Sequence, residues 1–456
     1  RLSGVDPAVG FNMGVALWYA LVMIGAFGVV QMLVEKARAS FADSRASIRW
    51  GLLGALCVGF LGNLEGLLDT AYHRGLLPLS FIQWFDIKNL TESAPTGGWT
   101  GGFWWWWRAS RVIHDKDLVG NSVEVIDEFP AFSFILGDLH PHVLALPFVL
   151  LAVGLAVNLL YWKPEAGWAQ LRCARKLDGR SFAAHGSWKE AVARGWRGLG
   201  AATGLGTAGV VLYALALGAL GFLNTWDFPI YVGLATLALG AALALREVLG
   251  LAVIGRALLG GLVLGALGGL LYLPFYIGFQ SQLGGLRPNL LFPSRFSQFF
   301  LMFGPFLVVA VSFLLALTLG ALARRPRLAG VARPFLATLP WTLLLPVLLL
   351  AFLMLGMVIL VALPGGASYL QEILSQPGVG ERAGDGTVGG LAALVVRLRL
   401  AAPWTWLVLA VLIAWGVGVA WALMRRTARE DDGPAPRTDI LAVFMIVIAL
   451  VLDRRA

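Results

Sequence analysis

The residues best suited to chemistry in this sequence lie in one stretch, "DEFPAFSFILGDLHPHVLALPF", at positions 127–148. Its first sixteen positions, 127–142, include five ionisable side chains: Asp127, Glu128, Asp138, His140 and His142. The stretch then runs directly into sequence apolar enough to enter a membrane. Ionisable groups at the edge of a membrane are costly, so their presence there indicates a functional site.

Asp138, His140 and His142 occupy alternate positions, and Pro141 favours an extended backbone at the residue before it. Alternate side chains of an extended segment share a face, so the three are expected to converge. Such a group could bind a divalent metal, orient a phosphate or act as acid and base. We take all three as candidate metal ligands, with Mg²⁺ or Mn²⁺ as the candidate cofactor. The open alternative is that the two histidines cap the helix entering the membrane.

Asp127 and Glu128 are adjacent, so in a regular helix or strand they point in different directions. One of them is then free for catalysis while the other pairs with Arg108 or Arg111. The candidate catalytic carboxylates are therefore Glu128, Asp138 and Asp127. A loop-anchoring salt bridge is the alternative for the 127–128 pair.

Arg108 and Arg111 are three residues apart and are candidates for a fork that holds phosphate or carboxylate. Trp107 ends a run of four tryptophans, 104–107, that suits the membrane interface or the lining of a lipid or sugar site. We assign Arg108, Arg111 and Trp107 as candidate substrate contacts. Contact with lipid headgroups is the alternative for the arginines.

A second motif, "NTWDFP" at 224–229, joins two apolar segments. Asn224, Trp226 and Asp227 in this motif are further candidate substrate contacts. The alternative is a polar helix cap, because Pro229 suits the start of the following helix. A third polar set, Asn63, Glu65 and Asp69, lies at the end of another apolar segment.

The elements that must position these residues are apolar helices. The chain has 456 residues, of which 58% are hydrophobic and only 13% charged, about half the charged share of a soluble domain. Its apolar runs predict an all-α polytopic membrane protein, a single multi-span domain over residues 1–456. The net charge of +9 comes from basic residues in short loops, where they set topology, so nucleic acid is not an expected partner.

About ten spans are predicted, and a long loop at 70–141 contains the main motif region. Basic residues cluster in alternate connections, so the positive-inside rule places them in the cytoplasm and the motif loops on the outer face of the cytoplasmic membrane. Loop 364–402 is rich in glycine and is predicted to be mobile. The spans are 11–33, 50–69, 142–162, 199–222, 230–246, 250–275, 298–320, 335–363, 403–424 and 438–452.

Several motifs together resemble a known family. "WRASRVI" (107–113), "GNLEG" (62–66), "GFLNTWDFPIY" (221–231) and "LPFYIGF" (273–279) appear with the 127–148 stretch in the order found in the Chlor-Arch-YYY membrane proteins. That family of unknown function occurs in Chloroflexota-like bacteria and archaea, and the resemblance extends over most of the chain. It implies kinship with type-C glycosyltransferases, polytopic enzymes that take sugars from polyprenyl-phosphate donors at the outer membrane face.

This sequence differs from the family pattern in two respects. The family pattern has an earlier span and an outer loop with a tyrosine triplet, so this chain is expected to be a fragment whose principal acidic base lies upstream. At position 127 the family usually has Asn where this sequence has Asp. The predicted function is glycosyl transfer from a lipid-phosphate sugar, with membrane lipids as partners. The alternative is a non-catalytic subunit that scaffolds a larger complex with other membrane subunits. A transporter is less favoured, because the spans contain almost no midplane charges.

Overall fold

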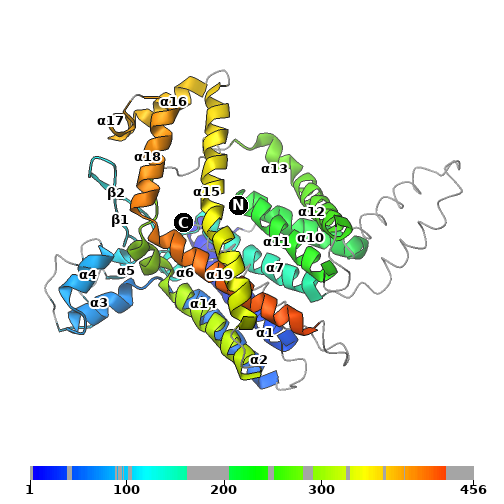
Figure 1. The fold of residues 1–456 in the computed structure, drawn as a ribbon. Helices are drawn as coiled ribbons and strands as arrows, with labels where there is room; N and C mark the ends of the chain where they lie inside the picture. The colour runs from blue at the N-terminus through cyan, green and yellow to red at the C-terminus, as the bar shows by residue number, and fades with distance from the viewer. Residues whose placement is uncertain are drawn as a thin grey trace, which may run out of the picture. The chain divides into compact units, whose positions relative to one another are not determined.

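The structure is a computed structural model that is mostly helical (Figure 1). It groups into two compact units, each of which is described by itself. Unit 1 comprises Arg1–Phe60 and Ser133–Ser281, and unit 2 comprises Leu61–Phe132 and Gln282–Ala456. The predicted single multi-span domain stays a prediction. The described residues are 4–37, 44–87, 90, 95, 97–100, 105–161, 205–244, 251–280, 291–324, 329–362, 366–384 and 386–427.

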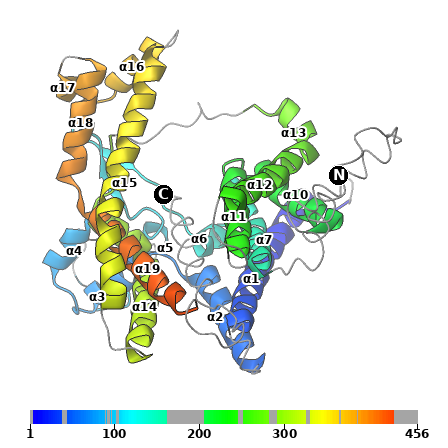
Figure 2. The same ribbon diagram turned by 45° about the vertical axis from the view of Figure 1, so that its right-hand side comes forward.

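Unit 1 is a bundle of apolar helices. Helix α7 packs against α1, α10 and α11, and α12 packs against α10 and α11 (Figure 2). The helices of this unit are α1 (Pro7–Ala37), α2 (Ser44–Phe60), α7 (Pro141–Tyr161), α10 (Gly206–Leu223), α11 (Asp227–Ala244), α12 (Leu251–Leu271) and α13 (Leu273–Gly278). Helix α6 (Pro130–Leu136) enters the unit from Ser133 onward.

Small residues set the distance between these helices. A Cβ atom on Gly218 of α10 would lie only 2.6 Å from the Gly268 carbonyl oxygen of α12, so the two backbones approach closely. Glycine at these positions therefore lets the two apolar helices pack closely. Hydrogen bonds join several polar groups inside the bundle. The Asn158 amide donates to the Tyr213 hydroxyl at 2.8 Å, and the Trp18 indole N–H donates to the Leu144 carbonyl at 2.8 Å.

Unit 2 combines long apolar helices with short elements. Helix α15 runs beside α19, which also contacts α14 (Figure 1). A hydrophobic core under the short elements includes Tyr72, Phe85, Val112 and Leu301. The elements are α3 (Glu65–His73), α4 (Leu79–Phe85), α5 (Trp105–Arg108), β1 (His114–Lys116), β2 (Ser122–Glu124), α14 (Phe296–Arg324), α15 (Ala329–Ala362), α16 (Gly366–Leu374), α17 (Val379–Ala383), α18 (Val388–Ala401) and α19 (Trp404–Thr427).

Strands β1 and β2 form an antiparallel hairpin in which His114 pairs with Glu124. The Asp117 carboxylate closes its turn, because it accepts backbone N–H groups of Val119 at 3.0 Å and Asn121 at 2.8 Å. The described parts of the predicted loop 70–141 thus contain short helices, this hairpin and a hydrophobic core. These described parts in unit 2 are therefore folded and can hold side chains in place.

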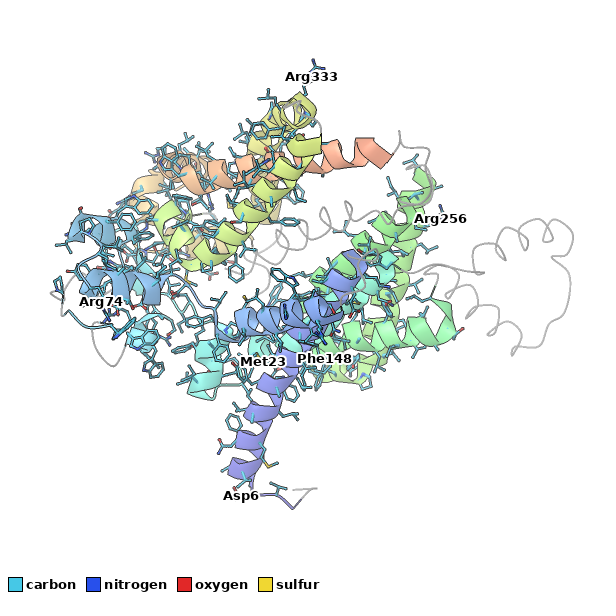
Figure 3. The ribbon with its side chains drawn as sticks, turned by 90° about the horizontal axis from the view of Figure 1, so that it is seen from below. Asp6, Met23, Arg74, Phe148, Arg256 and Arg333 are labelled. Carbon is cyan, nitrogen blue, oxygen red and sulfur yellow. The ribbon has the colours of Figure 1, made fainter. Side chains whose placement is uncertain are left out.

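Six described helices are long and apolar enough to cross a membrane, or up to eight if two interrupted helix pairs each count as one span. The chain is therefore an integral multi-pass membrane protein, as predicted. Outward-pointing side chains along these helices are mostly carbon (Figure 3), and Ile24 on α1 is 65% exposed, as expected for lipid contact.

Two predicted boundaries are wrong within the described residues. The predicted span 50–69 is interrupted, since α2 ends at Phe60 and α3 begins at Glu65. The predicted loop 364–402 contains three helices, α16, α17 and α18, and a bend of 69° separates α18 from α19. The predicted span 438–452 lies outside the described residues.

Candidate functional site

The Asp138–His140 segment is a short connection between two helices of unit 1. Helix α6 ends at Leu136, and Gly137 turns the chain with a φ of +72°, a conformation that favours glycine. The backbone N–H of Asp138 then donates to the Ser133 carbonyl at 2.9 Å. Pro141 begins α7, where its missing N–H costs nothing.

His140 occupies the position just before α7. Its carbonyl accepts the backbone N–H groups of Val143 at 2.9 Å and Leu144 at 3.0 Å, so its main chain caps the first turn. The backbone role and the side-chain role are separate, because capping by the carbonyl leaves the imidazole available. The predicted alternatives of helix cap and chemical site are therefore compatible at His140.

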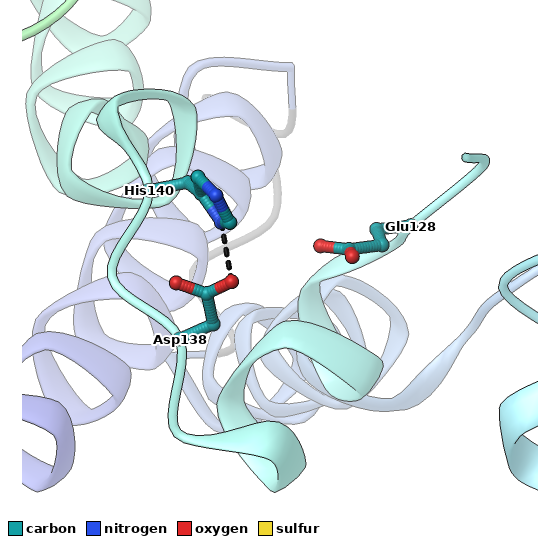
Figure 4. Close-up of side chains that lie close together, drawn as sticks. All are labelled: Glu128, Asp138 and His140. Carbon is teal, nitrogen blue, oxygen red and sulfur yellow. Dashed lines mark ion pairs between the residues drawn. The ribbon is translucent and has the colours of Figure 1, made fainter.

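Asp138 and His140 form an ion pair between Oδ2 and Nδ1 (Figure 4). The Asp138 side chain is 28% exposed and the His140 side chain 57% exposed. When Nδ1–H donates to the carboxylate, Nε2 is the proton acceptor of the ring, and the carboxylate stabilises the ring when it becomes charged. The pair has the composition of an acid–base dyad. Glu128, also labelled in Figure 4, belongs to unit 2 and is described below.

His142 lies beside this pair. Its ring is nearly parallel to that of His140, with centroids 5.7 Å apart and an interplanar angle of 13°. Asp138, His140 and His142 are therefore close together, as predicted. The predicted reason, a shared face of an extended segment, is correct only in part. His142 belongs to the first turn of α7 and not to an extended segment. Of the three predicted metal ligands, Asp138 and His140 are in contact, whereas among the described residues His142 is in no group of three ligand atoms that all lie within 4.8 Å of one another.

In unit 2, Arg111 is held by several groups. Its guanidinium lies over the Trp107 ring at 4.5 Å and donates to the Ser110 hydroxyl at 2.6 Å. Its Nη1 is 3.9 Å from Glu128 Oε1, and its Nε is 3.7 Å from Glu124 Oε1. Glu128 is 9% exposed and Glu124 is 62% exposed. The predicted pairing of an arginine with the 127–128 carboxylates is confirmed for Glu128.

Arg108 is held by different carboxylates. Its Nη1 lies 3.0 Å from Asp69 Oδ1 and 3.8 Å from Glu65 Oε1, both on α3 and both fully buried. Arg108 and Arg111 therefore do not form one fork, since each guanidinium has its own acidic partners. The buried pairing of Arg108 indicates a structural role.

Asp127 is almost fully buried, and it joins two parts of the loop. Its Oδ2 accepts the Val112 backbone N–H at 2.9 Å, and its own N–H donates to the Ser110 carbonyl at 3.0 Å. These backbone hydrogen bonds anchor the loop, and the salt bridge of the predicted alternative is formed by Glu128 with Arg111. Of the tryptophan run, Trp104 lies outside the described residues, whereas Trp106 and Trp107 contact the Phe132 ring at 5.7 Å each.

The "NTWDFP" motif forms the turn between α10 and α11 in unit 1. The Asn224 N–H donates to the Leu220 carbonyl at 2.7 Å, and the Asp227 N–H donates to the Asn224 carbonyl at 2.9 Å. Asp227 is 1% exposed at the start of α11, and Trp226 is 41% exposed. The geometry is that of a tight turn between two helices, and Trp226 is more exposed than Asp227.

Sequence reasoning missed a second acid–base cluster, in unit 2. Asp86 Oδ1 lies 3.0 Å from His114 Nδ1, and Arg295 Nη1 donates to Asp86 Oδ2 at 2.8 Å. Arg295 and Gln298 also donate to the His114 carbonyl. Asp86 has a left-handed φ of 54°, which is uncommon for a residue other than glycine. These residues are far apart in the sequence, and no local pattern brings them together.

A family described as uncharacterized membrane protein (DUF2298) matches residues 1–453 of the chain. Comparison with curated proteins and with solved structures gave no match.

Proposed function

We infer that this chain, which belongs to the DUF2298 family of uncharacterized membrane proteins, is an enzyme that transfers a sugar from a polyprenyl-phosphate donor to a hydroxyl acceptor at the outer face of the cytoplasmic membrane. The observation that supports it best is the Asp138–His140 pair at the start of the apolar helix α7. An acceptor hydroxyl needs a base, and a lipid donor needs a membrane helix nearby.

The proposed step moves one proton and one glycosyl group. The acceptor O–H gives its proton to Nε2 of His140 while its oxygen bonds to the anomeric carbon of the sugar. The bond between that carbon and the phosphate oxygen breaks, and the electron pair leaves with the polyprenyl phosphate. Asp138 stabilises the imidazolium formed in this step. His142 stacks beside the reacting ring and helps to position it.

Within unit 2, taken by itself, Arg111 is a better candidate than Arg108 for contact with a phosphate-bearing ligand. The side chains of Glu65 and Asp69, which contact Arg108, are fully buried. A phosphate that took Arg108 away would leave a buried charge without its partner, which costs free energy. One partner of Arg111, Glu124, is 62% exposed and is therefore weakly held. The aromatic ring of Trp107 under Arg111 is a surface on which a sugar or lipid could pack.

A divalent cation remains a candidate cofactor. If Asp138 and His140 held it, His140 would be a ligand and not the proton acceptor, and the ion would supply charge neutralisation for a departing phosphate. An imidazole ligand suits Mn²⁺ better than Mg²⁺, because Mg²⁺ prefers oxygen donors and retained water. The test is to remove metal with a chelator, add back Mn²⁺ or Mg²⁺, and compare the rates of lipid-phosphate release.

The test is release of lipid phosphate from a polyprenyl-phosphate sugar by the purified chain in vesicles. His140→Ala is expected to lower the rate by about 10²–10⁴-fold, the usual contribution of a general base. Asp138→Asn is expected to lower it as well, because the amide cannot stabilise the imidazolium. Glu381→Gln, an exposed change on α17, is the control and is expected to keep the wild-type rate. Equal rates in all three variants would exclude this site.

A second candidate is a non-catalytic membrane subunit. The observation that favours it is that Arg108 and Arg111 are both engaged by carboxylates of their own chain. In that case the purified chain releases no lipid phosphate from any donor, and it elutes from native membranes within a larger assembly. Release of lipid phosphate by the chain alone excludes this candidate.

A further inference from the structure

A buried polar cluster in unit 2 takes no part in the proposed transfer. Glu65, Asp69 and His73 follow one another at intervals of four residues on α3, so they lie on one face of that helix. All three are 0% exposed. The fourth member, Arg108 on α5, is 15% exposed through its side chain. Interiors contain ionisable groups only when these are paired or neutralised, so the charge balance of this cluster determines its stability.

The cluster contains two carboxyl groups and one permanent cation. Arg108 Nη1 is 3.0 Å from Asp69 Oδ1, a charge-assisted hydrogen bond. His73 Nε2 is 3.3 Å from the same Asp69 oxygen. Asp69 is therefore well placed to be the ionised carboxylate. If both carboxyl groups were ionised and His73 neutral, the buried cluster would have a net negative charge, which is costly.

Glu65 is the carboxyl group with the poorest support for a charge. Among the described residues, neither of its buried side-chain oxygens has a hydrogen-bond donor. Its nearest cationic atom, Arg108 Nη1, is 3.8 Å away. Trp105 covers this part of α3, since a Cβ on Gly66 would lie 3.3 Å from its ring. Desolvation without hydrogen bonds favours the neutral form of a carboxyl group.

Two other described helices of this part of unit 2 add no charge by their sequence. Helix α4 contains no titratable residue, and α14 contains none before Arg324. The groups that face Glu65 are therefore Asp69 on its own helix and Arg108 on α5, with His73 a turn beyond Asp69. One extra proton on Glu65 or on His73 makes the cluster neutral, and Glu65 is the carboxyl group whose charged form has no hydrogen-bond donor among the described residues.

We propose that this cluster is a buried proton-binding site and that Glu65 holds the proton at neutral pH. Because Glu65 is then neutral, Arg108 forms its ion pair with Asp69. Loss of the proton would place a second negative charge beside Asp69 and draw Arg108 toward Glu65. The site therefore couples proton release to the contact between α3 and α5. It stands independently of the proposed glycosyl transfer.

The pH dependence has a definite sign. An unfolded glutamate releases its proton near a pH of about 4.3, whereas the folded chain keeps it to higher pH. The folded state then binds more protons than the unfolded state, so the stability of unit 2 falls as the pH rises from about 4.3 to the pH at which Glu65 ionises. Glu65→Gln mimics the protonated carboxyl group and is expected to remove this loss.

The experiment compares thermal unfolding of the full chain in detergent for Glu65→Gln, Asp69→Asn and the exposed control Glu381→Gln between about pH 6 and pH 9. Glu65→Gln is expected to melt within about 2 °C of the wild type at neutral pH and with a weaker alkaline decline. Asp69→Asn is expected to melt roughly 5–10 °C lower, because it removes the partner of Arg108 and His73.

Infrared spectroscopy of the wild-type chain tests the same point without a variant. A carboxylic-acid carbonyl band is expected at neutral pH, and it should disappear in Glu65→Gln while remaining in Glu381→Gln. The proposal is overturned if the wild type has no such band, or if His73 is found as the imidazolium by its nitrogen chemical shifts. It is also overturned if Glu65→Gln destabilises the chain as much as Asp69→Asn.

Discussion

Replacement of Arg108 by Met is expected to destabilise unit 2 strongly. The methionine side chain fills similar space without charge, so Asp69 loses its 3.0 Å partner and stays fully buried. Removal of one member of a buried ion pair costs about 3–5 kcal/mol, mostly because the other charge is left uncompensated. For a unit of this size, each kcal/mol lowers the melting temperature by roughly 2–4 °C, so a decrease of about 10 °C is expected.

A matched change elsewhere in the same unit tests whether burial is the cause. Arg295 also pairs with an aspartate, Asp86 at 2.8 Å, but its side chain is 41% exposed and that of Asp86 is 37% exposed. Water compensates much of the lost interaction there, so Arg295→Met is expected to cost about 1 kcal/mol. Arg108→Lys keeps the charge but not the planar guanidinium, and an intermediate effect is expected.

The assay is thermal unfolding of each full-length variant in detergent, followed by tryptophan fluorescence and by circular dichroism. The expected order of stability is wild type, Arg295→Met, Arg108→Lys and then Arg108→Met. If Arg108→Met and Arg295→Met melt at the same temperature, the buried pairing of Arg108 contributes no more than a surface pair. The structural role assigned to Arg108 would then be wrong.

Two further predictions concern other parts of the molecule. Burial raises the pKa of Asp86, but hydrogen bonds from His114 and Arg295 outweigh it and hold that pKa below its ordinary value. The ionised Asp86 carboxylate therefore stabilises the fold above its unfolded pKa of 3.8, and this stabilisation is lost as the pH falls through the folded pKa. Asp86→Asn removes the titrating group, so the decrease of stability at acid pH should become smaller. Gly218→Ala should destabilise unit 1 by about 1–3 kcal/mol, because the added methyl group meets a backbone carbonyl of α12 at 2.6 Å. Gly233→Ala, where a Cβ has no neighbour within 4 Å, is the control, and equal melting temperatures for the two variants would refute the close approach.

Much of the helical architecture was predictable because apolar length is a local property. The predicted spans 11–33, 142–162 and 298–320 correspond to Pro7–Ala37, Pro141–Tyr161 and Phe296–Arg324. The break after Phe60 was not predictable, because it depends on a distant contact. Asn63 donates to the Ala109 carbonyl at 2.5 Å and accepts the Glu65 N–H at 3.0 Å, which favours a turn over a continuous helix.

The helix inside the predicted loop 364–402 had a local signal. Thr387 precedes α18, and its hydroxyl oxygen accepts the Gly390 N–H at 3.1 Å, the usual geometry of a helix cap. The apolar run after it, "LAALVV", was visible in the sequence, but the surrounding glycines favoured an irregular segment. Here the cap and the packing of α18 outweighed the weak helix propensity of glycine.

The sequence by itself determined that this is a multi-pass membrane protein, and it indicated that Asp138, His140 and His142 lie together. Both follow from short-range properties: apolar runs of sufficient length, and three residues within five positions beside a proline. Only the tertiary structure decided the partners of the arginines. Arg108 pairs with Asp69, 39 residues earlier, and Arg295 pairs with Asp86, 209 residues earlier. Such pairs depend on which helices pack together, because a charge in a low-dielectric interior is stable only beside the partner that folding brings to it.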